Sequence, residues 1–492
     1  MKQKAGVIGS GIAGISSAIR LADKGYAVEV FEQADKPGGK LSQLKLHGFR
    51  FDTGPSLFTL PGLVDELFSL AGKNPENYFR YRLLESSCRY FWEDGTVVNA
   101  WKEPEQFAEE VSTNTNVEKD NILAFLKKSR RLYDITHEVF LFSSFHKISN
   151  YARPAYRNSL LHLHELDAFT TMHKKNTRWF SDPRVVQLFD RYATYNGSNP
   201  YKTPATLNII PHLEHNTGTF FPKKGMYSIV EAMIKLATDM GVRFRFNSPV
   251  EEIILERGTV KGLRSGGETY PFDLLVSDVD VVNLYRHLIP GKKVPRKQLS
   301  GDRSTSALIF YWGINKSFPE LGLHNIFFSN DYREEFTHLF AKKTIFDDPT
   351  VYIFISCREV PGDAPTGQEN WYVMINVPEN TGQDWDSLIA KARKDILSKI
   401  RRVTGKEIEP HIVTEAIADP RSIEADTGSW RGSLYGLSSN SSFSAFNRHP
   451  NFKKSLKNLY FTGGSVHPGG GIPLCLASAR IAINEIPTSE TN

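Results

Sequence analysis

The pattern of apolar and polar positions predicts a strand, a helix and a second strand within the first 32 residues. Apolar residues run together over 5–8 and again over 26–31. Between these runs they recur at helical spacing, at Ile15, Ala18, Ile19 and Ala22. A short continuous apolar run is typical of a buried strand, and a period near 3.6 is typical of a helix packed on one face. Gly25 then marks the end of the helix.

Three glycines lie in the turn between the first strand and the helix. Gly9, Gly11 and Gly14 form the pattern G-x-G-x-x-G, and Glu32 ends the second strand. Gly9 permits a tight turn, Gly11 lets the backbone approach a pyrophosphate, and Gly14 lets helix and strand pack closely. The helix N-terminus offers N–H groups to phosphate, and Glu32 can accept hydrogen bonds from a ribose. The unit therefore predicts dinucleotide binding.

The rest of the chain alternates between helical and strand-like periods. Helices are expected at 63–70, 121–133, 136–145, 229–240, 385–403 and 472–483. Strands are expected at 49–51, 242–246, 249–253, 274–278, 307–312, 351–355, 371–375 and 459–461. The runs at 307–312, 351–355 and 371–375 are spaced like neighbouring strands of one sheet.

Two further glycine-rich stretches follow predicted strands. Gly38-Gly39-Lys40 comes directly after the first unit and predicts a second loop of N–H groups, with a lysine, beside the same pyrophosphate. As an isolated signal, Pro37-Gly38-Gly39 also fits an ordinary surface turn. Near the C-terminus, Gly463-Gly464 follows a strand and a helix begins at Ile472-Pro473, where proline suits a first helical turn.

Together these motifs resemble those of the bacterial-type carotenoid desaturases, which are FAD enzymes related to phytoene desaturase. The first glycine unit, Gly38-Gly39-Lys40, the stretch 51–56 (FDTGPS) and the stretch 458–473 (NLYFTGGSVHPGGGIP) carry the resemblance. It covers essentially the whole chain. It implies an α/β fold of the amine-oxidase and GDI-like superfamily, with an FAD-binding Rossmann-like domain. An interleaved substrate domain would contain a mixed β-sheet and a helical, membrane-facing part.

The resemblance and the local amino-acid composition together divide the chain into three parts. Residues 1–80, 222–300 and 420–492 are expected to form a discontinuous FAD-binding domain. Residues 81–221, rich in helix formers and poor in glycine, are expected to form the helical, membrane-facing part. Residues 301–419 are expected to form the β-rich substrate domain.

The resemblance implies FAD as the cofactor. The backbone of a residue placed like Val250 contacts adenine in related flavoproteins, and the strand ending at Asp278 lies beneath the cofactor. The N-terminus of the last helix would stabilise negative charge on reduced flavin. The expected cofactor-binding residues are Gly9, Gly11, Ile12, Ala13, Gly14, Glu32, Gln33, Gly39, Lys40, Leu41, Gly54, Pro55, Ser56, Val250, Asp278, Gly463, Gly464, Gly471, Ile472 and Pro473.

The resemblance also implies a reaction, the introduction of C=C bonds into a C40 carotene by hydride transfer to flavin N5 and loss of a proton. The local sequence is most similar to members that act at the 3,4 position of a carotene or hydroxycarotene end. A proton beside a developing allylic cation is acidic, so no essential base is expected. The candidate polar groups, with positioning roles, are Asp190, Arg191, Tyr195 and His215. For each of them a structural hydrogen bond or ion pair is the alternative.

Three other functions remain open from the sequence. A phytoene desaturase would work stepwise to lycopene, and a flavin-dependent carotenoid isomerase would catalyse no net oxidation. A non-catalytic prenyl-lipid carrier would resemble the Rab GDP-dissociation inhibitors, which share this type of fold and lack functional FAD. The intact glycine motifs at both ends of the chain argue against the carrier.

The composition argues against nucleic acid as a partner and against a metal site or a disulfide framework. The net charge of +5, from 60 basic and 55 acidic residues, is too small to indicate nucleic-acid binding. Cys88, Cys357 and Cys475 are far apart, which predicts neither a disulfide framework nor a thiolate metal site. His162 and His164 do not share a helix face and have no evident further ligands, so no metal site is expected.

A membrane surface is the expected location of the protein. The sequence has no apolar run of about 20 residues to span a bilayer, and its first strand starts too close to Met1 for a signal peptide. A C40 carotenoid must nevertheless be taken from lipid. The basic and aromatic stretch from Phe140 to Arg157 is the expected contact, although it also fits a helical core with a solvated basic face. We expect a cytoplasmic protein on the inner face of the cell membrane, with oxygen or a quinone as electron acceptor.

Overall fold

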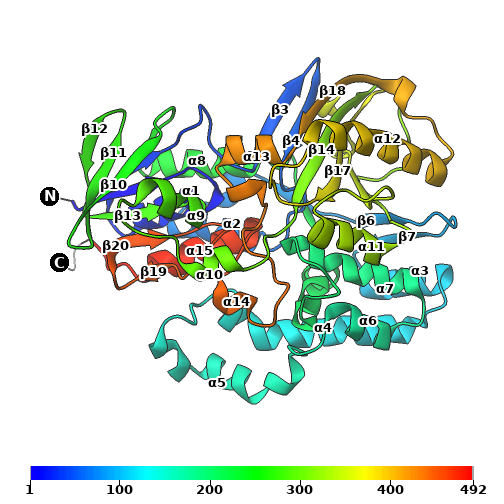
Figure 1. Ribbon diagram of the computed structural model, residues 1–492, viewed down its shortest axis with the longest axis horizontal. Helices are drawn as coiled ribbons and strands as arrows, with labels where there is room; N and C mark the ends of the chain where they lie inside the picture. The colour runs from blue at the N-terminus through cyan, green and yellow to red at the C-terminus, as the bar shows by residue number, and fades with distance from the viewer. Residues whose placement is uncertain (1, 490–492) are drawn as a thin grey trace.

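Two β-sheets of different character form the framework of the molecule and lie toward opposite ends of its long axis (Figure 1). The computed structural model describes residues 2–489. A nine-stranded sheet contains the first glycine unit, and a seven-stranded sheet lies on the other side. A group of helices packs below the seven-stranded sheet in this view.

The nine-stranded sheet has a parallel centre. β1 pairs with β2 on one side and β13 on the other, and β20 pairs with β13, all in parallel. Its strands are β1 (Lys4–Ile8), β2 (Ala27–Phe31), β9 (Arg243–Arg245), β10 (Val250–Glu256), β11 (Thr259–Ser265), β12 (Glu268–Pro271), β13 (Leu274–Ser277), β19 (Phe452–Lys453) and β20 (Leu456–Phe461). Parallel strands end at one edge, where ligands of such sheets bind.

Helices cover this sheet because their apolar faces match it. Helix α1 packs against α2, α8 and α15, and its residues Ile15, Ala18 and Ile19 are fully buried. The helices of this part are α1 (Ile12–Asp23), α2 (Gly62–Leu70), α8 (Ser228–Asp239), α9 (Val281–Asn283), α10 (Arg296–Ser300), α13 (Pro420–Thr427), α14 (Ser444–Asn447) and α15 (Ile472–Asn484). The α/β class predicted from the sequence is confirmed.

The seven-stranded sheet is mixed, and its order is β18-β14-β17-β16-β15-β6-β7. Its strands are β6 (Ser86–Phe91), β7 (Val97–Trp101), β14 (Ser306–Ile314), β15 (His324–Phe327), β16 (Val351–Phe354), β17 (Glu369–Val377) and β18 (Ile412–Ala418). The runs predicted at 307–312, 351–355 and 371–375 are indeed neighbours. Helix α12 (Trp385–Thr404) packs on one face, and α11 (Tyr332–Thr337) follows β15.

The other face of this sheet is rich in tyrosine and meets the nine-stranded part. Tyr311 and Tyr372 lie opposite each other on β14 and β17. The ring of Tyr311 contacts that of Phe51, with centroids 5.6 Å apart. Phe51 belongs to β4 (Phe49–Thr53), which forms a hairpin with β3 (Ser42–Leu46). The two parts of the molecule therefore share one hydrophobic core.

The division of the chain differs from the expected one between residues 81 and 101. The sequence predicts this stretch to belong to the helical part, but β6 pairs with β15 and β7 pairs with β6. Four of the six residues of β6 are buried, including Tyr90, and β6 lies between β15 and the edge strand β7. A further strand, β5 (Tyr81–Leu83), pairs with β8 (Phe220–Pro222).

The helical part consists of α3 (Pro104–Asn114), α4 (Lys119–Phe140), α5 (Pro154–Leu161), α6 (Met172–Trp179) and α7 (Pro183–Asp190). The prediction of two helices at 121–133 and 136–145 was wrong, because α4 is continuous. One buried stripe, including Ile122, Leu132 and Val139, runs along its whole length. The helix ends at Phe140, before the serines that follow.

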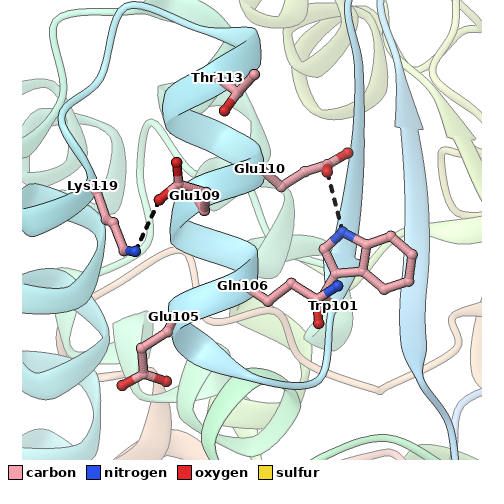
Figure 2. Close-up of a pocket in the computed structure, with 7 residues that line it drawn as sticks. All are labelled: Trp101, Glu105, Gln106, Glu109, Glu110, Thr113 and Lys119. Carbon is pink, nitrogen blue, oxygen red and sulfur yellow. Dashed lines mark hydrogen bonds and ion pairs between the residues drawn. The ribbon is translucent and has the colours of Figure 1, made fainter.

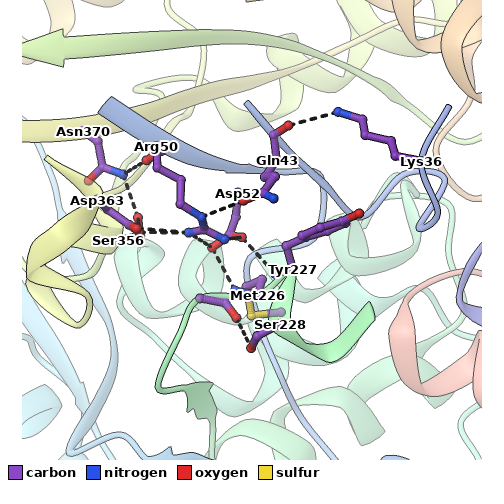
Figure 3. Close-up of polar contacts among 11 residues, drawn as sticks. Lys36, Gln43, Arg50, Asp52, Met226, Tyr227, Ser228, Ser356, Asp363 and Asn370 are labelled. Atoms are coloured by element: carbon purple, nitrogen blue, oxygen red, sulfur yellow. Dashed lines mark hydrogen bonds and ion pairs between the residues drawn. The ribbon is translucent and has the colours of Figure 1, made fainter. Parts of the chain in front are cut away.

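An ion-pair network fixes β4 between the two parts (Figure 3). Arg50 donates to Asp52 at 2.7 Å and to Asp363 at 3.1 Å. Asp52 also accepts hydrogen bonds from the backbone N–H groups of Met226 and Tyr227, at 2.8 and 2.9 Å. Because Gly54 follows β4 directly, this network sets the position of the loop that begins there.

No helix in the described part of the chain combines the length and apolar character needed to cross a bilayer.

Candidate active site

The turn after β1 excludes side chains at its glycine positions. Gly9 has a φ of +93°, in the left-handed region. A Cβ atom at Gly14 would lie 2.1 Å from the carbonyl oxygen of Gly9. One at Gly11 would lie 2.5 Å from the Oδ2 atom of Asp278. The turn is therefore built from backbone, which brings its N–H groups close to any ligand.

A second backbone loop lies beside the N-terminus of α1. Gly11 caps this helix and offers no side chain to its first turn. The N–H of Gly38 donates to the carbonyl of Ser10 at 2.9 Å, and a Cβ at Gly39 would lie 3.4 Å from the Cα of Gly11. Converging N–H groups at a helix N-terminus form the usual setting for a bound phosphate.

Glu32 lies at the end of β2, as predicted, and faces the glycine turn. It is 8% exposed and accepts hydrogen bonds from the N–H and the hydroxyl of Ser10, at 2.7 and 2.8 Å. Its other oxygen accepts from the N–H of Ala34 at 2.9 Å. The carboxylate thus braces the loop that surrounds it. Its role toward a ribose stays a prediction.

Asp278 brings a second carboxyl group to the same turn. Its Oδ2 accepts a hydrogen bond from the N–H of Gly14 at 2.9 Å. A Cβ at Gly463 would lie 2.2 Å from its Oδ1. Burial raises the pKa of this carboxyl group to about 7, and the charge of Glu32 acts in the same direction. The Gly14 hydrogen bond and Lys40 oppose the shift.

Lys40 and the loop after β4 close the site from the side of the second sheet. The ammonium group of Lys40 donates to the carbonyl of Leu434 at 2.7 Å, and burial lowers its pKa. A Cβ at Gly54 would lie 1.9 Å from the carbonyl oxygen of Lys40, so the two loops touch. The hydroxyl of Ser56, two residues later, lies 2.6 Å from that of Tyr352 on β16.

The C-terminal glycine motif adds a second helix N-terminus. Gly463 follows β20 with a φ of +96°, and Gly471 caps α15 with a φ of +100°. Pro473 lies in the first turn of α15, where its missing N–H group costs nothing. Asp278 accepts from the N–H of Gly14 in the first turn of α1, and its charge also acts on Cys475 in the first turn of α15, so both helix N-termini belong to one region.

We call this region the cofactor cradle. It comprises Gly9–Gly14, Glu32, Gly38–Lys40, Gly54–Ser56, Asp278 and Gly463–Pro473. The structure places the other candidates as follows: Leu41, Ile12 and Ala13 are buried, Gln33 is exposed, and Val250 begins β10 opposite Ser265. Ile472 is buried at the start of α15.

A buried polar cluster lies between the helical part and the seven-stranded sheet. Arg191 lies 3.5 Å from Glu214 and donates to the hydroxyls of Tyr90 and Tyr195, at 2.6 and 3.2 Å. Tyr195 in turn donates to Glu214. The members of the cluster are Ser87, Tyr90, Arg191, Tyr192, Tyr195, Glu214 and His215.

The cluster holds one full ion pair away from water. Arg191 is 5% exposed and Glu214 is 3% exposed. Burial opposes ionisation of Glu214, but Arg191, His215 and two hydroxyl donors hold its pKa at about 2. The guanidinium also lies over the rings of Tyr90, Tyr192 and Tyr195. Burial lowers the pKa of His215 to about 4, so this imidazole is neutral near pH 7.

Asp190 does not join this cluster. It is 1% exposed and accepts hydrogen bonds from His173 at 2.6 Å and from Asn176 at 2.8 Å, both on α6. Asn176 is bonded further to Asn208. Asp190 therefore fastens α7 to α6, whereas Arg191, Tyr195 and His215 come together as a group. The positioning roles of all four stay predictions.

Glu214 is the main member of the cluster that sequence reasoning missed. It lies between His212 and His215 in a short π-helical turn (His212–Asn216). The sequence shows only an acid between two histidines, which does not by itself indicate a buried ion pair. Among residues 2–489, no group of three or more His, Cys, Asp or Glu side chains is arranged to hold a metal ion. Nothing in the local sequence marks the partner as an arginine 23 residues earlier.

A shallow hollow on α3 is unrelated to either site (Figure 2). It is lined mainly by polar side chains: Trp101, Glu105, Gln106, Glu109, Glu110, Thr113 and Lys119. Within it, Lys119 pairs with Glu109 and the indole of Trp101 donates to Glu110 at 3.2 Å. These local pairs and the mainly polar lining give the hollow the character of ordinary surface.

The cofactor cradle fits a dinucleotide with a flavin. Its glycine positions leave space that a Cβ would fill, two helix N-termini meet there, and an acid ends β2. The parallel strands end at the same place, where dinucleotides bind in folds of this kind. The fold and the site together define a dinucleotide-binding oxidoreductase with a substrate domain over the cofactor.

Comparison with known proteins identifies the family. The model described as "Flavin containing amine oxidoreductase" matches residues 12–486, and the chain belongs to this family. FAD is its cofactor. The chain is 47% identical to the 1-hydroxycarotenoid 3,4-desaturase of Flavobacterium sp. (strain P99-3), over 99% of each chain. It is 32% identical to the 4,4'-diapolycopene oxygenase of Methylomonas sp, over 98% of each chain.

Solved structures confirm the fold. An oxidoreductase from Methanosarcina mazei aligns with a TM-score of 0.66 at 14% sequence identity, covering 98% of this chain and 100% of its own. The expected fold of the amine-oxidase type is therefore correct.

Proposed function

We propose that this protein is an FAD-dependent carotenoid desaturase that introduces a C=C bond at the 3,4 position of a 1-hydroxycarotenoid. The observation that carries the proposal is the 47% identity over the full length to a desaturase of that name. The cofactor cradle supports it, since the glycine, acid and helix elements that an FAD enzyme needs are all present.

The chain's own residues divide the work of binding the cofactor. The N–H groups at the start of α1 suit the pyrophosphate, and Glu32 suits the ribose hydroxyls. The N-terminus of α15 suits the flavin carbonyl on which negative charge grows. Bound FAD supplies the hydride acceptor for the reaction. The aromatic face of the seven-stranded sheet contributes to the hydrophobic core, and its Tyr352 contacts Ser56.

The buried polar cluster is suited to orientation more than to proton transfer. Glu214 is held ionised by Arg191 and two hydroxyl donors, and a carboxylate with a pKa of about 2 is a weak base. His215 stacks on Phe107 at 4.1 Å and bonds to Tyr192 at 2.8 Å. The cluster therefore fixes the wall of the substrate region, and the reaction proceeds without an essential base.

Product analysis tests this function. The protein would be expressed in hosts that accumulate phytoene, lycopene or a 1-hydroxycarotene. We expect a new conjugated bond only in the 1-hydroxycarotene host. Stepwise conversion of phytoene would support a phytoene desaturase instead, and isomerisation without oxidation would support an isomerase. An oxygenated product would support an oxygenase activity instead, like that named for the relative from Methylomonas sp.

We further propose that the protein binds peripherally to the inner face of the cell membrane. The segments around α5, α10 and α14 are neighbours, and in Figure 1 α14 lies between α10 and α5. Gln298 of α10 donates to the carbonyl of Asn447, and Ser442 donates to that of Ala168. Exposed apolar side chains on these segments are Tyr151, Leu161, Phe169, Leu299, Phe443 and Phe446, with exposures from 44% to 91%. Exposed apolar groups of this number on neighbouring segments favour contact with lipid.

The basic residues expected at this contact are not equivalent. Lys147 pairs with Glu485 at 2.7 Å, so its charge is already compensated. Arg153 and Arg157 are exposed, and among described side chains neither forms an ion pair. Arg153 and Arg157 are therefore the better candidates for contact with anionic lipid.

Liposome flotation tests the membrane proposal. Leu161→Ser with Phe443→Ser should reduce flotation severalfold, and Arg153→Ser with Arg157→Ser should reduce it on anionic liposomes only. The matched control is Val413→Ser with Ile417→Ser, because these exposed apolar residues lie on β18. Unchanged flotation of the α5 and α14 variant would place the contact elsewhere. Reoxidation of the reduced protein by air or by a quinone in the liposomes identifies the electron acceptor.

A further inference from the structure

A chain of hydrogen bonds leads from the cofactor cradle to a buried histidine. The hydroxyl of Ser56 lies 2.6 Å from that of Tyr352, which lies 2.8 Å from Nδ1 of His324. His324 is 2% exposed, and its ring stacks on Phe354 with centroids 5.1 Å apart. The hydrogen bonds and the stacking together fix the orientation of the imidazole.

The other ring nitrogen of His324 has no partner. Nε2 is buried and forms no hydrogen bond with any described residue. Burial lowers the pKa of this imidazole to about 3, so it is neutral near pH 7. Buried polar groups are nearly always paired, and an exception in a folded protein calls for an explanation. A ligand that brings its own polar group would supply one.

Two further unpaired nitrogens lie in the same region. Nε of Arg191 and Nδ1 of His215 are also buried, and neither forms a hydrogen bond in the part of the chain that the structure describes. The sheet register places the buried polar cluster next to His324. Tyr90 of the cluster lies opposite Ile326, and Ile326 lies opposite Tyr352, which bonds to His324. The charges of Glu214 and Arg191 both act on His324. These two charges neutralise each other, so the region suits an uncharged polar group better than an ion.

We propose that Nε2 of His324 binds the hydroxyl group of the carotenoid substrate and thereby selects hydroxylated substrates. The proposal rests on the proposed function. A hydroxyl group both donates and accepts, so it satisfies Nε2 in either tautomer of the imidazole. Ser56 and Tyr352 are positioning residues, since they hold the ring through Nδ1.

The position of the hydroxyl explains how this contact also selects the bond. In a 1-hydroxycarotenoid that is oxidised at the 3,4 position, a single carbon separates the hydroxyl-bearing carbon from the reacting bond. A group that holds the hydroxyl therefore holds the reacting bond near it. The series of hydrogen bonds that ends at His324 begins at Ser56, a residue of the cofactor cradle. The hydroxyl site and the cofactor site are thus neighbours.

The test compares two substrates that differ only in the hydroxyl group at C1. A site built to hydrogen-bond a hydroxyl group rejects the analogue that lacks it, so the wild type should prefer the hydroxylated substrate by about a hundredfold or more in kcat/KM. His324→Phe keeps a stacked ring and removes the polar atoms. It should lower that preference at least tenfold, mainly through a higher KM for the hydroxylated substrate.

Further variants separate recognition from damage to the fold. His324→Gln retains a hydrogen-bonding group and should recover part of the preference. Tyr352→Phe should lower it less than His324→Phe does. Tyr372→Phe is the matched control, because within residues 2–489 its hydroxyl hydrogen-bonds only to the sulfur of Met374 on the same sheet face. Unchanged FAD content and circular dichroism show that each variant is folded.

The outcomes distinguish the two proposals. A wild-type preference that survives in both His324→Phe and His324→Gln would overturn the role of His324 while leaving the desaturase function intact. Equal use of both substrates by the wild type would also overturn it. If the wild type oxidises neither carotenoid, the proposed function fails, and the hydroxyl site fails with it.

Discussion

The cofactor cradle and the buried polar cluster are constructed in different ways. In the cradle, backbone groups line the site, and glycines are required because a Cβ would collide with a neighbouring loop. In the cluster, side chains from β6, the 3₁₀ segment Arg191–Asn196 and the π-helical turn His212–Asn216 are joined by hydrogen bonds and one ion pair. The first arrangement is ready to bind an anion, whereas the second already contains its own counter-ion.

The difference has consequences for mutation. In the cofactor cradle, a side chain introduced at a glycine position should block the ligand, while the surrounding strands and helices keep their packing. A buried ion pair loses stability when one partner is removed, because the other charge stays behind without compensation. Variants in the two regions should therefore separate cofactor binding from stability.

The largest expected effect is on stability, from Arg191→Met. Removing this guanidinium leaves Glu214 buried and unpaired, which should cost about 3–5 kcal/mol in the free energy of unfolding. Urea unfolding measures it. The double variant Arg191→Met with Glu214→Leu should be more stable than the single one. A single variant as stable as the wild type would show that the pair is not as buried as the structure has it.

The second largest effect is expected on FAD affinity, from Gly14→Ala in the cofactor cradle. The new Cβ would approach the Gly9 carbonyl oxygen to 2.1 Å, so the turn must open. We expect FAD affinity to fall by about a hundredfold or more, equivalent to roughly 2.7 kcal/mol. Gly62→Ala is the control, since nothing lies within 4 Å of its would-be Cβ. Equal FAD content in both variants would contradict the tight turn.

A smaller effect is a pH dependence of FAD binding through Asp278. Its pKa of about 7 is raised above the usual range, so the folded protein holds a proton there that the unfolded chain has released. The contribution of Asp278 to the free energy of unfolding therefore falls as pH rises toward 7. Because an ionised Asp278 repels the pyrophosphate, FAD affinity should fall above pH 7 by up to about tenfold per pH unit.

Titration of apoprotein with FAD across pH 6–9 measures this dependence. Asp278→Asn should abolish it, whereas Asp280→Asn, two residues away, should retain it. A slope that survives in Asp278→Asn would assign the proton to another group.

The smallest effect is expected from Glu32→Gln. The amide retains an oxygen that accepts a hydrogen bond from the Ser10 loop, but it loses the charge that favours ribose hydroxyls. FAD affinity should fall by about three- to tenfold, with little change in thermal stability. Fluorescence titration with FAD gives the ratio, and identical affinities would remove Glu32 from the ribose role.

The same contrast explains what the sequence could predict. Gly9, Gly11 and Gly14 were recognisable because backbone approach requires glycine at a fixed spacing. The strands around Tyr311, Tyr352 and Tyr372 were recognisable from their apolar runs. The expected break in α4 near residue 134 was wrong, because the chain carries no proline or glycine there and the buried stripe continues.

Long-range partners could not be predicted in this way. Glu214 pairs with Arg191 only because two separate turns meet beside Tyr90 of β6. Asp190 is next to Arg191 in sequence, yet it bonds to α6 on another side. The strand pairing of β6 with β15, across more than 200 residues, likewise depends on the packing of the whole molecule.

The central claim, that the protein oxidises a hydroxylated carotenoid with its own FAD, is tested most directly by anaerobic single-turnover flavin reduction. The FAD-loaded protein would be mixed with 1-hydroxycarotenoid in liposomes, without oxygen or quinone. We expect that the oxidised flavin absorbance disappears and that one new 3,4 double bond forms per flavin. Flavin that stays oxidised while bound and folded, with the substrate recovered unchanged, would contradict it.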